Sequence, residues 1–347
     1  MREACAGCKA PIGVFDSGVG GLTVLKALSA ELPREHFVYL GDTARLPYGT
    51  KSPETVARYA LQAAEALLEY GVKCLVIACN TASSVGLPAI RERFVREHIE
   101  GVPVIGVIEP GAEAACATSR SGRIAVIATE GTVRGGAYQE AILRLRSRAS
   151  VIAQPTQLFV ALAEEGLHQG PIAESVARHY LHPLFNTSRP VAPSAGIHVA
   201  ARNTVIDHDV AAGHNTARDR ATGNAAARDG ANSPNTSGTS NPTSAPDTLV
   251  LGCTHFPMLL SAIRAAIGPD VHIVDSAATT AKSVRELLDR QGFAACKGLA
   301  ACKGLTRQAG EGASRFLATD SVERFARIGS LFLERPIDPD EVELVDL

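Results

Sequence analysis

Short apolar runs alternate with helical patterns over residues 11–185. Between the runs, apolar positions recur at helical spacing, most clearly over Thr23–Glu31 and Pro53–Tyr70, and Ser52 before a proline marks a helix start. Apolar strands that alternate with helices are typical of parallel sheets buried on both faces. The pattern therefore predicts a parallel α/β fold, with strands at Ile12–Phe15, Phe37–Leu40, Cys74–Ala78, Val104–Ile108 and Arg123–Ala128.

The alternation stops near residue 186 and resumes near Asp247. The tract in between is rich in Ala, Asn, Thr, Ser, Gly and Asp. Such a composition cannot bury enough apolar surface to offset the entropy lost on ordering, so we predict a disordered insertion at 186–246. Beyond it we expect strands at Thr248–Leu251 and Arg315–Ala318 and helices at Pro257–Ile267, Thr279–Arg290 and Val322–Leu331.

An internal repeat links segments that lie far apart in the chain. LVIACNT ends one expected strand with Cys79, and the similar LVLGCTH ends a later strand with Cys253. A second pair, IGVFDSG and IGVIEPG, ends each strand with a carboxylate, Asp16 or Glu109. If the predicted insertion is left out of the count, the separation of Glu109 from Cys253 becomes comparable to that of Asp16 from Cys79. The simplest interpretation is two related α/β halves.

We therefore predict an α/β fold of two pseudo-symmetric parallel-sheet domains, Rossmann-like or flavodoxin-like, with the active site in the cleft between them. The first domain is expected to be discontinuous and the second to carry the insertion. Residues 1–10 are expected to form an N-terminal extension, and a duplicated AACKGL at 294–305 a surface insertion. The expected boundaries are 11–104 plus 276–332 for the first domain, 105–275 for the second and 333–347 for a tail.

Composition narrows the class of protein. The chain has 347 residues, 46% of them hydrophobic, and a formal net charge of -2, which gives no sign of a nucleic-acid or acidic-membrane partner. No apolar run approaches the roughly 20 residues that span a bilayer, and the N-terminus lacks a signal-like apolar stretch. We expect a cytoplasmic protein whose eight cysteines are thiols rather than disulfides.

The repeated cysteines suit one kind of chemistry. Ligands of open parallel sheets bind beyond the carboxyl ends of the strands, where Cys79 and Cys253 are expected. If the halves face each other, the two thiols enter one cleft from opposite sides. Inversion of a stereocentre needs a base on one face of a carbon and an acid on the other, and a thiol can take either role.

Four motifs occur along the chain: FDSGVGGLT at 15–23, GDTARLPYG at 41–49, ACNTAS at 78–83 and GCTHFP at 252–257. In this order they resemble the glutamate racemase family of the aspartate/glutamate racemase superfamily. Together they are specific, and the resemblance covers most of residues 11–185 and 247–332. Ala161 and Gly135 stand where the family commonly has proline and serine.

The resemblance implies cofactor-independent interconversion of L- and D-glutamate by two-base proton transfer, without a metal. Cys79 resembles the thiol that exchanges the α-proton with D-glutamate, and Cys253 the thiol that does so with L-glutamate. Asp16 resembles the carboxylate beside the first, and His255, helped by Glu164, the imidazole beside the second. Substrate-binding roles fall to Asp16, Ser17, Tyr48, Gly49, Asn80, Thr81, Thr254 and His255.

The resemblance also implies a place in metabolism and an assembly state. D-glutamate would feed bacterial peptidoglycan synthesis, which supports the cell wall and cell shape. Family members commonly form homodimers, although the sequence specifies no interface. Glutamate is then the expected partner, with no nucleic acid and no membrane.

Other interpretations of single residues stay open. Cysteines at strand ends are often small buried hydrophobic residues, our interpretation of Cys74 and Cys116. Asp16 and His255 could cap helices, and Tyr48 could pack a turn. We prefer a structural role for Glu109, and we leave Arg45 outside the site as a solvated charge. The glycines of GVGG are no dinucleotide fingerprint, because Thr23 stands where the third glycine is required.

Three other functions also stay open. The chain could act on aspartate or another acid, or it could be a binding or regulatory protein on a racemase scaffold. It could also be a thiol redox protein that uses Cys5 and Cys8. An assay of both enantiomer pairs separates the first two from glutamate racemisation, and truncation to Pro11 tests the third.

Overall fold

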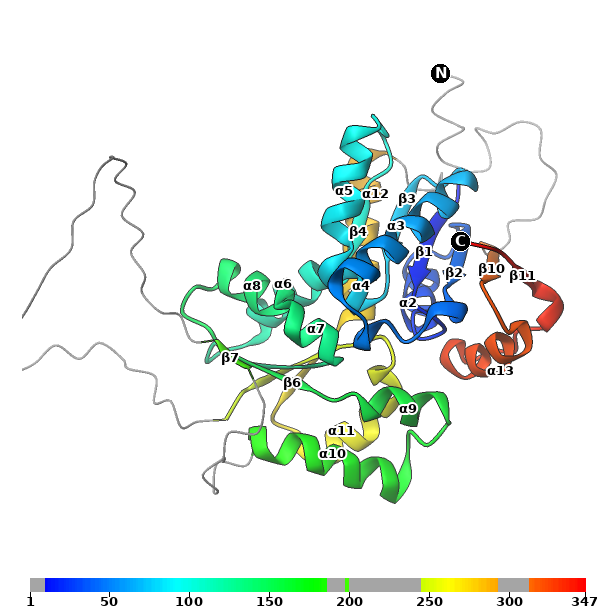
Figure 1. Cartoon of the computed structure of the whole chain (residues 1–347). Helices are drawn as coiled ribbons and strands as arrows, with labels where there is room; N and C mark the ends of the chain where they lie inside the picture. The colour runs from blue at the N-terminus through cyan, green and yellow to red at the C-terminus, as the bar shows by residue number, and fades with distance from the viewer. Residues whose placement is uncertain (1–9, 186–196, 200–244, 293–311) are drawn as a thin grey trace, which may run out of the picture. The chain divides into compact units, whose positions relative to one another are not determined.

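Two β-sheets organise the chain (Figure 1). The computed structural model describes residues 10–185, 197–199, 245–292 and 312–347. Both sheets lie in one compact unit. The expected α/β fold with two parallel sheets is confirmed.

Sheet A has six strands within the described residues, and each is parallel to its neighbours. They are β1 (Ile12–Asp16), β2 (Phe37–Gly41), β3 (Cys74–Ile77), β4 (Val104–Gly106), β10 (Ser314–Ala318) and β11 (Val342–Leu344). Their order across the sheet is β11-β10-β2-β1-β3-β4. The chain thus winds first to one side of β1 and then to the other, as in a doubly wound sheet.

Sheet B repeats this plan with five strands in the described part of the chain. They are β5 (Arg123–Ala128), β6 (Ser150–Pro155), β7 (Ile197–Val199), β8 (Thr248–Gly252) and β9 (His272–Asp275). The order is β7-β6-β5-β8-β9, and only β7 runs antiparallel to its neighbour. Here β5 takes the central place that β1 takes in sheet A, and β8 corresponds to β3.

Helices cover both faces of each sheet (Figure 1). The longer ones are α2 (Leu22–Glu31), α3 (Pro53–Glu69), α5 (Leu87–Arg96), α6 (Ile108–Thr118), α8 (Ala137–Leu145), α10 (Gly170–Phe185), α11 (Leu260–Ile267), α12 (Ser276–Gln291) and α13 (Val322–Leu333). The shorter ones are α4 (Asn80–Val85), α7 (Glu130–Gly135) and α9 (Leu158–Glu164). Single 3₁₀ turns are η1 (Thr43–Arg45), η2 (Tyr48–Thr50), η3 (Phe256–Leu259) and η5 (Pro339–Glu341).

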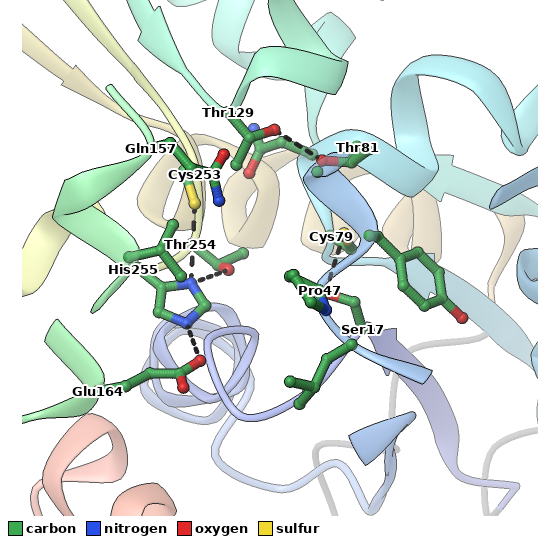
Figure 2. A pocket seen from close by; sticks show the side chains of 16 residues that line it. Ser17, Pro47, Cys79, Thr81, Thr129, Gln157, Glu164, Cys253, Thr254 and His255 are labelled. Atoms are coloured by element: carbon green, nitrogen blue, oxygen red, sulfur yellow. Dashed lines mark hydrogen bonds and ion pairs between the residues drawn. The ribbon is translucent and has the colours of Figure 1, made fainter. Parts of the chain in front are cut away.

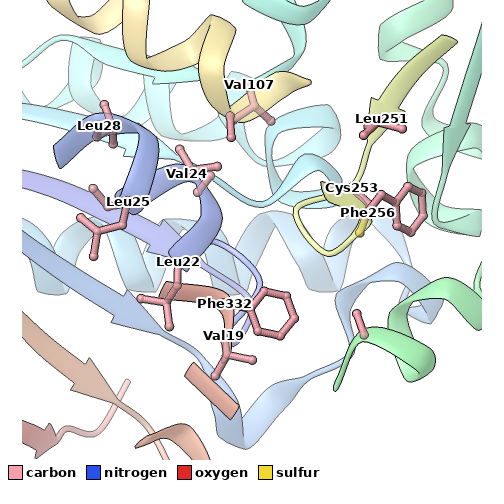
Figure 3. Close-up of a cluster of buried hydrophobic side chains, with 14 of the residues drawn as sticks. Val19, Leu22, Val24, Leu25, Leu28, Val107, Leu251, Cys253, Phe256 and Phe332 are labelled. Carbon is pink, nitrogen blue, oxygen red and sulfur yellow. The ribbon is translucent and has the colours of Figure 1, made fainter. Parts of the chain in front are cut away.

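Side chains alternate between the two faces of each strand, as strand geometry requires. In β3, Val76 belongs to the core that includes α2, whereas Leu75 and Ile77 belong to the core that includes α3. The first of these cores is shared by both sheets. Figure 3 shows its α2 side chains, among them Leu22 and Val24, in one cluster with Leu251 and Phe256 of the other half.

The structure corrects two expected segments. The segment 333–347, predicted as a tail, adds β11 to the edge of sheet A. Within the tract 186–246, predicted as disordered, residues 197–199 form β7, which pairs with β6. Residues 186–196 and 200–244 lie outside the described residues. Both strands are three residues long, too short for a hydrophobic pattern to identify.

Other expectations differ in detail or stay untested. The strand expected at Val104–Ile108 ends at Gly106, because Ile108 starts α6. The extension 1–10, apart from residue 10, the duplication 294–305, and Cys5 and Cys8 lie outside the described residues. Sheet A takes strands from residues 12–106 and 314–344 and sheet B from 123–275, while the domain boundaries themselves stay a prediction. None of the helices in the described ranges is long and apolar enough to cross a membrane.

Candidate active site

The candidate site lies where both sheets present the carboxyl ends of their central strands. In sheet A the order reverses at β1, with Ser17 directly after β1 and Cys79 just beyond β3. In sheet B it reverses at β5, with Thr129 directly after β5 and Cys253 directly after β8. Such switch points leave a crevice for a ligand.

A small cavity occupies this position and takes its walls from both sheets. Figure 2 shows Cys79 and Cys253 on opposite sides of the cavity. Every residue that we predicted for the site lines it, apart from Asp16. The sheet A half contributes Ser17, Tyr48, Gly49, Cys79, Asn80 and Thr81, and the sheet B half contributes Glu164, Cys253, Thr254 and His255.

Cys79 lies in a buried setting close to the carboxyl group of Asp16. It caps α4, where its sulfur accepts the Ala82 N–H at 3.5 Å, and its thiol donates to the Ser17 hydroxyl at 3.5 Å. Burial, together with the nearby charge of Asp16, raises the pKa of the Cys79 thiol to about 12. Its resting form is therefore the protonated thiol.

Cys253 lies beside an imidazolium. Its sulfur is 3.7 Å from Nδ1 of His255, whose Nε2 is 3.0 Å from Oε1 of Glu164. Burial lowers the pKa of His255, but hydrogen bonds to Cys253 and Glu164 outweigh it and raise that pKa to about 10. Burial raises the pKa of Glu164, but the hydrogen bonds to His255 and Arg324 and the charges of these two residues together outweigh burial, so the pKa is lowered overall. The charged ring can donate a hydrogen bond from Nδ1 to the sulfur of Cys253.

Asp16 lies beneath the cavity rather than in its wall. Its Oδ2 accepts the Gly18 N–H at 2.9 Å, and Oδ1 is buried without a hydrogen-bond partner among the described residues. Burial raises its pKa, although His255 and backbone amides partly oppose the shift. The carboxyl group influences Cys79 through its charge.

The turn 42–50 brings Tyr48 and Gly49 to the cavity. The buried Asp42 anchors it, since this carboxylate accepts from the Tyr48 hydroxyl, from Nε of Arg45 at 2.6 Å and from the Thr319 hydroxyl at 2.9 Å. Arg45 is outside the cavity, as expected, but it is not a solvated charge: its side chain is 17% exposed. The ion pair with the buried carboxylate of Asp42 accounts for this low exposure of Arg45.

Polar side chains near the cavity also join the two halves. The hydroxyl of Thr81 lies 2.9 Å from that of Thr129 and 3.0 Å from that of Thr132. Nδ2 of Asn80 donates to the Tyr138 hydroxyl at 2.9 Å, which leaves its Oδ1 buried and unpaired among the described residues. This carbonyl oxygen is ready to accept a donor from a ligand.

The glycines after β1 permit a close approach between the halves. A Cβ at Gly20 would lie 2.4 Å from Cε1 of His255 and 2.5 Å from the Thr254 hydroxyl, and a Cβ at Gly21 would lie 2.5 Å from Asp16. The glycines are thus needed for space, and α2 begins only at Leu22.

Sequence reasoning missed part of the wall. Thr129 and Gln157 line the cavity, and Oε1 of Gln157 is buried without a partner in the described part of the chain. Thr129 follows the apolar strand β5, a signal that could have identified it. Gln157 precedes the short α9 and follows β6, a strand that the apolar pattern did not reveal, so nothing pointed to it.

The internal repeat holds for only one of its two pairs. Cys79 and Cys253 follow β3 and β8, which are topologically equivalent. Glu109, however, lies in the first turn of α6, half exposed, 2.5 Å from Arg144. Its strand, β4, is an edge strand of sheet A, whereas the equivalent of β1 is β5. Glu109 does not line the cavity, so a structural role stays our preferred interpretation. Cys74 is buried in β3, and Cys116 is on α6 outside the cavity.

No group of three or more metal-ligating side chains occurs within the described residues.

The chain is similar to known proteins along nearly its whole length. Residues 12–179 match the Asp/Glu/Hydantoin racemase family. A glutamate racemase from Geobacter metallireducens is 39% identical over 322 residues, which cover 93% of this chain and 92% of that protein.

Solved structures of glutamate racemases are also similar to this chain. A glutamate racemase isoform from Bacillus anthracis gives a TM-score of 0.71 at 30% identity, covering 97% of this chain and 98% of that one. A glutamate racemase from Francisella tularensis, solved with D-glutamate, gives 0.70 at 29% identity, covering 98% of each chain.

The fold and these similarities define the protein as a racemase, an enzyme of the isomerase class. Within that class, the chain belongs to the glutamate racemase family. The resemblance drawn from the four sequence motifs is confirmed.

Proposed function

We propose that this chain interconverts L- and D-glutamate by proton transfer between Cys79, Cys253 and the α-carbon. The observation that carries the proposal is the pair of thiols facing each other across one cavity (Figure 2). One sulfur removes the α-proton, and the opposite thiol protonates the planar carbanion on its other face. The relative solved with D-glutamate supports the choice of substrate.

The two thiols have different surroundings. The imidazolium of His255 lies beside the sulfur of Cys253, whereas burial and the charge of Asp16 hold Cys79 as a thiol. By the family resemblance, Cys253 is the thiol that exchanges the α-proton with L-glutamate. Asp16 acts on Cys79 by its charge. Glu164 acts on Cys253 by orienting His255.

Polar groups of the wall would hold the substrate's charges. Oδ1 of Asn80 is a free acceptor for the ammonium group, because Tyr138 fixes the amide from the other side. Hydroxyls of Ser17, Thr81 and Thr254 can donate to the carboxylates, as can the backbone at Gly49. We propose that no cofactor is required, that the enzyme works in the cytoplasm as a homodimer, and that its D-glutamate supplies peptidoglycan synthesis.

The test uses purified, metal-free protein without added cofactor. Each glutamate enantiomer in deuterated water should racemise with incorporation of deuterium at the α-carbon. Cys79→Ser and Cys253→Ser should each lose nearly all racemisation, while Cys116→Ser, outside the cavity, should keep it. Full activity in either cavity variant would refute the two-base mechanism. Faster turnover of aspartate than of glutamate would refute the substrate.

A further inference from the structure

Glu164 is held from two sides. Its Oε1 lies 3.0 Å from Nε2 of His255, and its Oε2 accepts from Nη2 of Arg324, also at 3.0 Å. The Glu164 side chain is only 16% exposed. Both carboxylate oxygens are thus engaged, which fixes the plane of the group as well as its position.

Arg324 reaches Glu164 from the other half of the molecule. It lies in the first turn of α13, which follows β10 of sheet A, whereas Glu164 ends α9 beside sheet B. Phe325 and Ile328 bury the inner face of α13 in the shared core. The ion pair therefore ties the relay at Cys253 to an element that the core anchors.

The same helix also contacts the imidazole directly. The ring of Phe332 meets the ring of His255 edge-on, with centroids 5.2 Å apart and planes at 80°. α13 thus supports the relay at two points, the ring of His255 through Phe332 and its hydrogen-bond partner through Arg324. The Arg324 side chain is half exposed, but the carboxylate that it holds is largely buried and also bonds to the imidazole.

We propose that Arg324 is a positioning residue for proton transfer at Cys253: it holds the Glu164 carboxylate so that one oxygen faces His255. The inference rests on the proposed function and deepens it. Without the guanidinium, Oε2 would be free to rotate toward water, and the carboxylate would no longer orient the imidazole next to the sulfur.

The first experiment compares Arg324→Ala with Arg324→Lys and with Arg327→Ala. Arg327 lies on the same helix and is exposed, so Arg327→Ala removes the same charge as Arg324→Ala and serves as the control. Because small errors of position can cost up to about 100-fold, we expect Arg324→Ala to lower kcat by about tenfold or more. Lysine should restore part of it, and Arg327→Ala should resemble the wild type. The melting temperature should change little in all three variants.

A double-mutant cycle tests whether Arg324 acts through Glu164. If it does, Arg324→Ala should add less than about twofold to the loss already caused by Glu164→Gln. An undiminished loss in the Glu164→Gln background would overturn the inference, and so would equal activity of Arg324→Ala and Arg327→Ala.

Isotope effects give a readout that general damage would not produce. If only the step at Cys253 slows, the primary effect with 2-deuterated L-glutamate should rise and that with 2-deuterated D-glutamate should fall. A shift of both in the same direction would contradict the proposal. Failure of the wild type to racemise glutamate would instead refute the proposed function, and this inference with it.

Discussion

At the scale of single residues, the two thiols differ more than their sequence motifs suggest. Both were predicted from similar strand ends, and both lie in the cavity. Asp16 lies near Cys79, whereas His255 lies beside Cys253 and is bonded to Glu164, which is 91 positions from His255 in the chain. No local pattern encodes such a contact, because it depends on how α9 packs against the loop after β8.

The charge of His255 leads to a prediction about stability. Its pKa is raised from 6.5 to about 10, so its bound proton stabilises the folded state fully below pH 6.5 and progressively less as the pH rises toward 10. The melting temperature of the wild type should therefore exceed that of His255→Gln most near pH 6, and the gap should narrow toward pH 10.

The gap is measured by thermal unfolding at several pH values. Each unit of pKa shift corresponds to about 1.4 kcal/mol, so the pH-dependent part should be on the order of a few kcal/mol. His179→Gln, at an exposed histidine, is the control and should stay close to the wild type throughout. A gap that is constant with pH would show that His255 is not charged in the folded protein.

Gln157 leads to a prediction about substrate binding. Its buried Oε1 lacks a partner among the described residues, which is costly unless a ligand supplies one. Gln157→Leu keeps the approximate size and removes the amide. We expect KM for glutamate to rise by about tenfold, the value of a hydrogen bond to a charged group, while the melting temperature stays the same or rises.

Gln154→Leu is the matched control, since that half-buried amide donates to the Pro155 carbonyl and does not line the cavity. It should leave KM unchanged. If Gln157→Leu raised the melting temperature and left KM unaltered, the amide would have no contact with the substrate.

At the scale of elements, the turn between β1 and α2 controls how closely the halves meet. A Cβ at Gly20 would overlap the ring of His255. Gly20→Ala should therefore displace the imidazole from Cys253 and lower kcat by about tenfold or more. Gly20→Ser, with a longer side chain, should be worse. Steady-state kinetics measure both, and wild-type kcat in either variant would contradict this account of the glycine.

The elements that sequence predicted are those with long or fully apolar patterns. β1, β3, β5 and β8 are buried along almost their whole lengths, and α3 begins at the expected cap Ser52. β6 and β9 were missed because polar residues and a proline interrupt their short apolar runs. Exposed or half-buried positions weaken the pattern on which the prediction depends.

At the scale of the whole molecule, hydrogen bonds between the halves complete the cavity. The Thr23 hydroxyl donates to the Thr254 carbonyl at 2.9 Å, and Thr81 and Asn80 add the contacts to Thr129 and Tyr138. Sequence could predict two similar halves and the cysteine of each. It could not predict these contacts, because they depend on the relative orientation of the two sheets.

The tract between β7 and β8 gives a prediction at the same scale. Contacts outside this tract hold the chain where it returns to the sheet. Nε of Arg123 donates to the Ala245 carbonyl at 3.0 Å, and Asp247 accepts from Ser119 and from the Ser121 N–H. Replacing residues 200–244 by a short Gly/Ser linker should therefore leave kcat/KM within about twofold, because the closure entropy of a connection depends only weakly on its length.

A second deletion separates the tract from β7. Removing residues 186–244 also removes β7, which pairs with the edge of sheet B through β6. An exposed edge strand promotes association between chains, so this variant should show more aggregation in light scattering than the shorter deletion, with similar kcat/KM for its monodisperse fraction. Loss of soluble protein in the shorter deletion would mean that residues 200–244 take part in folding. Equal solubility of the two variants would mean that β7 does not protect the edge of β6.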